Sequence, residues 1–356
     1  MSVDVLVLSL GTTRGLQVAD AQLVELIRRA GASVAATSVR IGLGDRLRRG
    51  YPANDLVEAL AARRALDGAL ARERPRAVIF STTTASLLGG VPPEIPVGIW
   101  LDSPACLNRP GRPNAVLHAL ERRAMARARV ILPWSAPALE ALPAGVGRAL
   151  VVSPPIKLGP APAPEREPVV VAYTPDPKAK DLELLCRSWE HYVALAREPG
   201  SRTGARLRLT GIEPGWAREF LRRRGITTLP PCFELVGMLD RRGFRRELEH
   251  AAAFLSAARW EDFGQAPLEA LAAGAALVCA PGGGPFPALA LARQLEPRFV
   301  AATRSPDLLA RALALALDAG DLRAYRARAR AAVADLTADA VLTRLRDEVL
   351  PLLLGA

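Results

Sequence analysis

One stretch of the chain, residues 252–280, limits the folds available to the rest. It begins with a short apolar run, Ala252–Ser256, passes through a loop into an Ala- and Leu-rich segment, Gln265–Ala273, and ends in a second apolar run, Ala276–Ala280. Short apolar runs on either side of a helix are typical of buried parallel strands. Pro267 falls in the first turn of the predicted helix, where its missing N–H does no harm. The stretch therefore predicts strand, helix and strand in an α/β fold.

The start of this helix is a predicted phosphate site. Its free N–H groups, at about Phe263, Gly264 and Gln265, face the end of the parallel sheet, and the helix dipole favours an anion there. Glu261 precedes the helix and Glu269 lies about one turn inside it. Carboxylates repel phosphate but accept hydrogen bonds from sugar hydroxyls, so the arrangement suggests a nucleotide-sugar. The alternative is that Glu261 stabilises the helix N-terminus and Glu269 is solvated.

A family resemblance supports the nucleotide-sugar interpretation. The run Glu261-Asp-Phe-Gly, followed by Leu268-Glu-Ala-Leu-Ala-Ala-Gly274, resembles the EGFG…EAMAxG segment of family 4 (group 1) glycosyltransferases. The E-x7-E motif of that family falls on Glu261 and Glu269. The resemblance implies that Glu261 contacts the donor sugar and Glu269 the nucleotide ribose. It also implies the α/β GT-B fold, in which two Rossmann-like domains with parallel sheets face each other across a cleft.

Length and proline content indicate two domains. The chain has 356 residues, half of them apolar, which suits two full cores. Five prolines between residues 154 and 164 predict a semi-rigid linker. The predicted parts are an acceptor-binding domain (1–153), the linker (154–168), a nucleotide-sugar-binding domain (169–335), and a C-terminal helix (336–356) that packs on the first domain, as the family implies.

The net charge of +11 comes almost entirely from arginine. Residues 1–155 carry 19 Arg against 12 Asp plus Glu, hence +7, without one concentrated run. No interleaved aromatics or binding motif accompany the arginines, so we expect no nucleic-acid partner. A solvated basic face is favoured. Peripheral contact with an anionic membrane surface, including contact through Arg46, Arg48 and Arg49 in a predicted loop, is the alternative.

Other sequence features concern cellular location and metal binding. No run of about 20 apolar residues exists, so no membrane span is expected. The opening Met-Ser-Val-Asp lacks the charge pattern of a signal peptide. The four cysteines lack metal spacing and are expected to be reduced, mostly buried thiols, and three histidines argue against zinc. We expect a cytoplasmic protein. Any association with a membrane would be at its inner face. The sequence does not indicate an oligomeric state.

The chain opens as a Rossmann-like domain. Val3–Leu10 is a predicted buried strand, followed by the loop Gly11–Gly15 and a helix over Leu16–Ala30. The loop is not G-x-G-x-x-G, which disfavours a dinucleotide dehydrogenase. Gly11 lets the backbone approach a phosphate or sugar, and the family places this loop opposite the donor. Arg14 is a candidate contact for phosphates or acceptor, with a plain surface role as the alternative.

Further strands of this domain are predicted at 33–39, 76–81, 97–101, 129–133 and 149–153. Thr82–Thr84 follow one of them, at the edge where open α/β sheets place ligands. Asp102 follows another and is a candidate to accept a hydroxyl proton or orient the acceptor. Family members often carry a histidine near this point, which Asp102 or Leu101 replaces here. The structural alternative for Asp102 is a turn or cap.

The second domain restarts with a predicted strand at Val169–Tyr173 and a loop that contains Lys178 and Lys180. Lys178 falls on the lysine of the family's K-G-x-D pattern, although Ala179 replaces the glycine. The resemblance implies that Lys178 binds the donor diphosphate. The family's arginine after the preceding strand is absent, since Ala172 and Tyr173 stand there. Three residues are candidates to replace its charge: Lys180, Arg14 and Arg259.

Two backbone segments complete the predicted donor site. Gly237 and Met238 follow a predicted strand where the family receives the nucleobase. Residues 281–284 read Pro-Gly-Gly-Gly, a loop without bulky side chains, and an amide such as that of Gly283 is a candidate to bond sugar hydroxyls. A loose turn is the alternative there.

The residues together predict a hexosyltransferase-type glycosyltransferase with Lys178, Glu261 and Asp102 as catalytic candidates. Its partners would be a nucleoside-diphosphate sugar and a small-molecule, glycan or lipid acceptor, with no cofactor. The absence of an Asp-x-Asp pair suits metal-independent chemistry, and the resemblance implies retention of anomeric configuration. Because the family's arginine and histidine are missing, a non-catalytic nucleotide-sugar-binding protein stays open. A GT-B epimerase or phosphorylase is a third possibility, although no acid–base pair for epimerisation is found.

Overall fold

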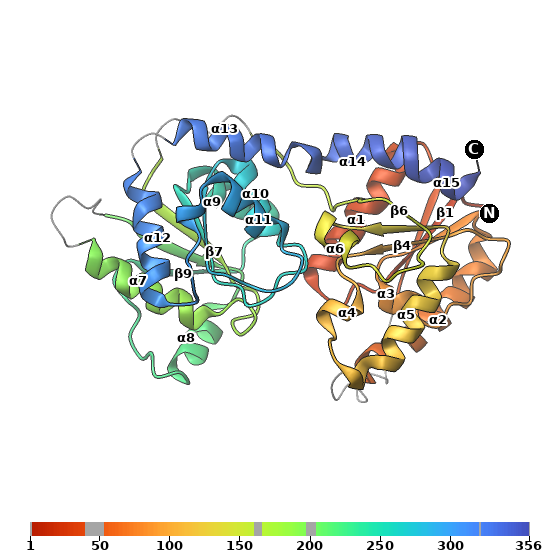
Figure 1. Cartoon of the computed structure of the whole chain (residues 1–356), viewed down its shortest axis with the longest axis horizontal. Coiled ribbons are helices and arrows are strands. Elements are labelled where there is room, and N and C mark those ends of the chain that lie inside the picture. Colours follow the sequence, from red (N-terminus) through yellow and green to blue (C-terminus); the bar gives the residue numbers. More distant parts are fainter. Residues whose placement is uncertain (1, 40–52, 160–165, 197–203, 320–321, 356) are drawn as a thin grey trace. The chain divides into compact units, whose positions relative to one another are not determined.

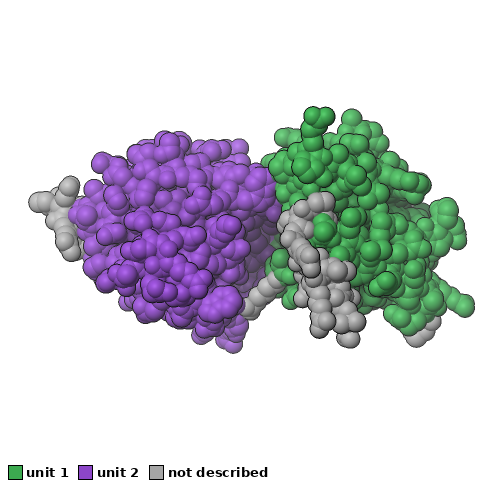
Figure 2. All heavy atoms as spheres, turned by 90° about the horizontal axis from the view of Figure 1, so that it is seen from below, with its two compact units in different colours: residues 1–155, 336–356 green, residues 156–335 purple. Residues whose placement is uncertain are grey.

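The computed structural model describes residues 2–39, 53–159, 166–196, 204–319 and 322–355. The chain divides into two compact units, residues 1–155 with 336–356, and residues 156–335 (Figure 2). Each unit contains its own parallel sheet with helices on both faces (Figure 1). The predicted α/β class with two parallel sheets is confirmed.

The first unit is built on a six-stranded parallel sheet in the order β2-β1-β3-β4-β5-β6. Its central strands are fully buried aliphatic runs, as their sequences predict. The strand order reverses beside β1, which opens a ligand-binding position at the carboxyl edge of the sheet. The strands are β1 (Val5–Ser9), β2 (Val34–Ser38), β3 (Ala77–Phe80), β4 (Val97–Leu101), β5 (Val130–Pro133) and β6 (Arg148–Ala149).

The last strand of this unit is shorter than predicted. The apolar run at 149–153 favours a full strand, but β6 covers only Arg148–Ala149. The N–H groups of Leu150 and Val152 still donate to β5 carbonyls, so the segment follows the sheet without a regular ladder. The Val152 carbonyl instead accepts from the indole of Trp100 at 2.7 Å.

Helices of the first unit form two groups, one on each face of the sheet (Figure 1). α1 (Arg14–Arg29) packs with the C-terminal segment, and α3 packs with α2 and α5 in the other group. The other helices that precede the C-terminal segment in this unit are α2 (Ala53–Glu73), α3 (Thr83–Ser86), α4 (Ala105–Asn108), α5 (Ala115–Arg127) and α6 (Ala136–Glu140).

The C-terminal segment is not the single helix that its pattern predicts. It consists of α14 (Ala338–Arg344), a π-helical turn (Leu345–Val349) and α15 (Leu350–Leu354). Pro351 has no N–H to donate back along the helix, and the π-turn ends two residues before it. The segment belongs to the first unit: α14 packs on α1, and Gly98 of β4 lies beside Leu353.

The second unit has a five-stranded parallel sheet in the order β11-β10-β7-β8-β9. β7 is central, and β10 and β11 come from the stretch that predicts strand, helix and strand. The strands are β7 (Val169–Tyr173), β8 (Arg206–Thr210), β9 (Phe233–Gly237), β10 (Ala253–Ser256) and β11 (Ala276–Cys279).

Helices of the second unit also form two groups. α7 (Leu182–Leu195) packs with α8 (Pro214–Arg222) and α12 (Pro306–Asp318), whereas α10 packs with α9 and α13. α11, which begins at a proline directly after the glycine-rich loop, is not among the predicted helices. The second group comprises α9 (Arg241–His250), α10 (Gln265–Ala273), α11 (Pro287–Leu295) and α13 (Arg323–Ala332).

Two further expectations concern the burial of the cysteines and the presence of membrane-spanning helices. Cys186 and Cys279 are buried, but Cys106 and Cys232 are exposed, so the prediction of mostly buried thiols was wrong for two of the four. Within the described ranges, the helices are too short or too polar to cross a membrane.

Candidate functional site

The N-terminus of α10 is shaped by a glycine. α10 covers Gln265–Ala273, as predicted, and Gly264 immediately before it has φ +74°. A Cβ at Gly264 would lie 2.9 Å from the ring of Phe286, so both the backbone angle and the space require glycine. Phe263 beside it is buried and belongs to the core. This turn leaves the first N–H groups of α10 at the carboxyl edge of the second sheet.

Glu261 lies in a small pocket beside this helix start, paired with a lysine. The Lys180 ammonium is 2.5 Å from Glu261 Oε1, and both side chains are largely buried. Burial raises the pKa of Glu261, and the positive charge of Lys180 opposes that rise. The pocket is otherwise lined mainly by apolar residues from β7, β10 and the first turn of α10.

Lys178, the residue predicted to bind phosphate, lies elsewhere in the same loop. Its side chain is exposed and forms no ion pair with another described residue, whereas its backbone N–H donates to Asp176 at 2.8 Å. The structure therefore brings Lys180, and not Lys178, into contact with Glu261. A phosphate-binding role for Lys178 stays a prediction.

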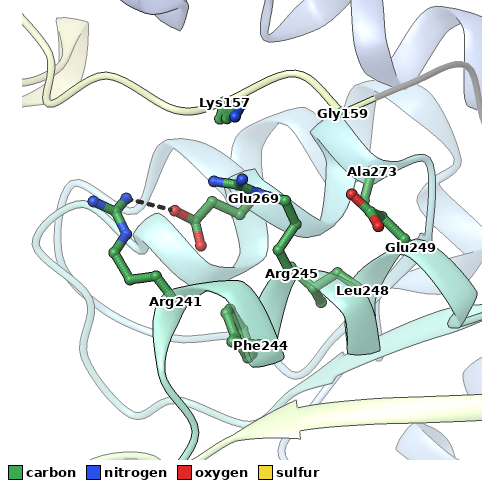
Figure 3. Close-up of a pocket in the computed structure, with 9 residues that line it drawn as sticks. All are labelled: Lys157, Gly159, Arg241, Phe244, Arg245, Leu248, Glu249, Glu269 and Ala273. Carbon is green, nitrogen blue, oxygen red and sulfur yellow. Dashed lines mark hydrogen bonds and ion pairs between the residues drawn. The ribbon is translucent and has the colours of Figure 1, made fainter.

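Glu269 lines a second pocket, between α9 and α10 (Figure 3). Its Oε1 atom lies 3.5 Å from the Arg241 guanidinium and accepts from the Gln265 amide at 3.3 Å. Burial raises the pKa of Glu269, and the charges of Arg241 and Arg245 oppose the rise. Figure 3 shows both arginines extending from α9 toward Glu269, and Lys157 on the other side of the pocket.

An arginine that sequence reasoning missed connects the loops around Glu261. The Arg304 guanidinium donates to the carbonyls of Ala257 (2.7 Å), Ala258 (3.0 Å) and Pro281 (2.7 Å), and pairs with Asp181 at 2.6 Å. Asp181 caps α7 with a left-handed backbone (φ +51°) and also pairs with Arg259. Arg304 thus fixes the ends of β10 and β11 relative to the loop that carries both lysines. The only sequence signal for this role of Arg304 is its position after β11, the last strand of the unit.

The glycine-rich loop after β11 is shaped by packing. A Cβ at Gly284 would lie 2.2 Å from the Glu261 carbonyl oxygen, so this glycine lets the loop approach the Glu261 segment. The Gly283 N–H already donates to the Arg259 carbonyl at 2.9 Å, and the Gly283 carbonyl accepts from the Glu261 N–H. The predicted hydrogen bond from Gly283 to a sugar would require this N–H to change partner.

The predicted nucleobase residues lie at the end of β9. Gly237 has φ +90° and its carbonyl accepts from the Gly211 N–H, next to a register shift between β8 and β9. Met238 is 44% exposed, which is unusual for a large apolar side chain. Arg241 begins α9 three residues later, so Gly237 and Met238 precede the pocket that contains Glu269 along the chain.

Candidate residues of the first unit lie at the carboxyl edge of its own sheet. Gly11 follows β1 with φ +55°, and its carbonyl accepts from the Gln17 amide at 2.9 Å. Asp102 directly follows β4 and accepts from the Ser103 N–H at 2.8 Å. Arg14 is the first residue of α1, but its side chain lies outside the described residues. The three loop arginines at positions 46, 48 and 49 also lie outside them.

A buried aspartate near this edge was missed. Asp20 of α1 accepts hydrogen bonds from Ser9 and Ser81, at the ends of β1 and β3, while its Oδ1 atom has no partner. Burial raises the pKa of Asp20 to about 6. Its neighbours in sequence are apolar or small, so no local pattern marks it.

The threonines after β3 are engaged within the unit. Thr82 caps the short helix α3 by accepting from the Ala85 N–H at 3.1 Å. The hydroxyls of Thr83 and Thr84 bond the buried carboxylates of Glu121 and Asp55 and lower the pKa of each against the effect of burial. The predicted ligand role of these hydroxyls would require them to leave these partners.

Metal binding is not supported by any cluster in the described part of the chain. No group of three or more His, Cys, Asp or Glu side chains there could hold an ion. Metal independence therefore stays a prediction about the reaction.

Solved structures define the fold. Sucrose-phosphate synthase from Thermosynechococcus elongatus superimposes with a TM-score of 0.70 at 16% identity, over 99% of this chain and 100% of that one. An E. coli structure described as trehalose-6-phosphate bound with UDP-2-fluoro glucose gives 0.69 at 11% identity, over 98% and 99%. An α,α-trehalose-phosphate synthase (UDP-forming) from Burkholderia xenovorans gives 0.66 at 13%, over 97% and 99%. The fold is GT-B.

The family of the second unit follows from sequence. Residues 167–319 match the family described as Glycosyl transferases group 1, which confirms the resemblance carried by Glu261 and Glu269. The second unit therefore resembles the group 1 glycosyltransferases, in a chain whose fold is GT-B. No curated protein matches the chain in sequence.

Proposed function

We propose that this protein transfers a sugar from a nucleoside-diphosphate sugar to an acceptor, and that its second unit binds the donor. The strongest support is the arrangement around α10, where Glu261 and Glu269 lie on either side of a helix N-terminus that Gly264 opens. The N–H groups suit a diphosphate, and the carboxylates suit the hydroxyls of the rings on either side of it.

The donor would lie along α10. The diphosphate would meet the N–H groups near Gly264 and Gln265, and Glu261 would accept from hydroxyls of the transferred sugar. Glu269 lies one turn further along the helix, about 5.4 Å, which suits the ribose. The base would then extend toward Met238 and Arg241, in the direction of the pocket in Figure 3.

Catalysis would depend on charge at the leaving group. As the glycosidic bond breaks, negative charge grows on the departing diphosphate, and fixed cations and N–H dipoles stabilise it. Lys178, Lys180 and the start of α10 are suited to this task. We propose retention of configuration without a metal: the acceptor attacks from the face of departure, and the leaving phosphate oxygen takes the acceptor proton.

The acceptor would bind to the first unit. Gly11 follows β1 and Asp102 follows β4, both at the ligand-binding edge of the sheet, and Asp102 would orient the acceptor hydroxyl for this transfer. The three similar structures described above are named for phosphorylated disaccharides, and one is a complex with glucose-6-phosphate. Sugar phosphates therefore belong in the first acceptor panel, beside glycans and lipids.

A donor screen tests the proposal. The purified protein would be incubated with UDP-, GDP- and TDP-sugars and with the acceptor panel, and release of nucleoside diphosphate would be measured. We expect release or transfer with at least one donor, unchanged by a chelator, and NMR of the product should show the anomer of the donor. Binding of a donor without hydrolysis or transfer would favour the non-catalytic alternative, in which the pocket holds the nucleotide-sugar only.

A further inference from the structure

The lysine beside Glu261 blocks the carboxylate that the sugar would need. Lys180 Nζ lies 2.5 Å from Glu261 Oε1, with 19% and 13% of the two side chains exposed. They are the only charged side chains that line this pocket among the described residues. Because both side chains are largely buried, the attraction between the two charges is stronger than on an open surface.

We propose that Lys180 and Glu261 form a latch that the donor opens: the diphosphate draws Lys180 away from Glu261, and the freed carboxylate then accepts hydroxyls of the sugar. This inference rests on the proposed function, since it assigns a role to Lys180 at the donor site. In this scheme Lys180 binds the diphosphate, and the partner of its ammonium group depends on whether the sugar is present.

The loop around Lys180 is built for a side-chain movement on a fixed backbone. The next residue, Asp181, pairs with both Arg304 (2.6 Å) and Arg259 (2.8 Å). The carbonyl of the preceding residue, Ala179, accepts from the Arg259 N–H at 2.9 Å. The backbone is therefore held on both sides of Lys180. Its ammonium is carried on a flexible four-carbon stem, so it can change partner without the loop unfolding.

The charges make binding of the diphosphate and the sugar interdependent. A diphosphate competes with Glu261 for Lys180, but a departing Lys180 leaves a buried carboxylate without its cation. In an intact donor, the sugar hydroxyls compensate that carboxylate. In the nucleoside diphosphate product they are missing, so Glu261 competes with the diphosphate for Lys180 and the product is held less tightly than the intact donor. The latch thus favours the donor over the product.

The experiment compares binding of uridine, guanosine and thymidine diphosphate to variants of the full chain by calorimetry. For the diphosphate that binds wild type best, Lys180→Gln should weaken binding about tenfold, the scale of a charged hydrogen bond. Glu261→Gln should tighten it on the order of fivefold, because Lys180 is no longer held. Lys180→Arg keeps the charge and should retain most of the affinity.

The matched control is Lys178→Gln, in the same loop but without contact to Glu261. Glu261→Gln should still tighten binding in the Lys178→Gln background and should have no effect in the Lys180→Gln background. Melting temperatures close to wild type would show that each variant is folded. Weaker binding by Glu261→Gln, or tightening that persists without Lys180, would overturn the latch alone. A wild-type protein that binds none of the three diphosphates would instead overturn the proposed function, and the latch with it.

Discussion

Lys178 and Lys180 are two residues apart, yet their environments differ completely. Lys178 is exposed, whereas Lys180 is largely buried against Glu261. The family pattern matches Lys178, and the geometry favours Lys180 as the cation closest to the predicted sugar site. Both can contribute, because Lys178 is free to reach a diphosphate from solvent.

Replacing Lys178 by alanine tests the residue that the pattern indicates. Loss of a charged hydrogen bond to the leaving diphosphate costs about 2–3 kcal/mol, or roughly 30–150-fold in turnover. The rate of nucleoside diphosphate release from the active donor would be compared with wild type. Unchanged turnover would remove Lys178 from the mechanism and leave Lys180 as the loop's only cation there.

Glu269→Ala tests the ribose contact. We expect affinity for free nucleoside diphosphate to fall at least about tenfold, because hydrogen bonds to a charged carboxylate are lost. Calorimetry measures the change. Glu249→Ala is the matched control, since Glu249 lines the other end of the same pocket. If both variants weaken binding equally, the effect is one of pocket charge and the ribose assignment fails.

At the scale of elements, α10 links local sequence to the site. Its bounds match those predicted, since a glycine precedes it, another follows it, and alanines and leucines fill it. Gly264 has to adopt a left-handed backbone with Phe286 packed against it. The helix start is thereby directed at the sheet edge rather than into the core.

Gly264→Ala should therefore disrupt the donor site more than an ordinary glycine substitution. The left-handed backbone costs a non-glycine residue about 1–2 kcal/mol, and the clash with the Phe286 ring adds to it. Gly225→Ala is the control, because Gly225 has φ +77° but open space around its Cβ position. We expect Gly264→Ala to lower both the melting temperature and nucleoside diphosphate affinity, and Gly225→Ala to lower only the former. Equal affinity losses would contradict this role of Gly264.

At the scale of the whole molecule, each unit is a separate α/β layer structure with its own buried groups. Asp20 is the clearest of these in the first unit. Its pKa is raised above the usual value, so the protonated form is favoured in the folded state. Its contribution to stability is therefore complete below pH 3.8 and is lost as the pH rises through about 6.

Asp20→Asn should remove this pH dependence. The shift from 3.8 to about 6 corresponds to about 3 kcal/mol. The quantity to measure is the difference in free energy of unfolding, wild type minus Asp20→Asn. This difference should fall by up to about 3 kcal/mol as the pH rises from 4 to 7. Hydrogen exchange of β1 and β3 amides measures it for the first unit alone. A difference that is the same at both pH values would show that Asp20 does not titrate as proposed.

Local patterns by themselves determined the alternation of strands and helices, the position of α10 and the spacing of Glu261 and Glu269. Apolar periodicity and glycine or proline at element ends act over a few residues, so they can be read along the chain. The latch partner Lys180, the Arg304 contacts and the buried Asp20 required the tertiary structure. In each case the partners lie 11 to 123 residues apart in sequence, and only the folding of the sheets brings them together. Side-chain burial across loops depends on such distant neighbours, which no local pattern encodes.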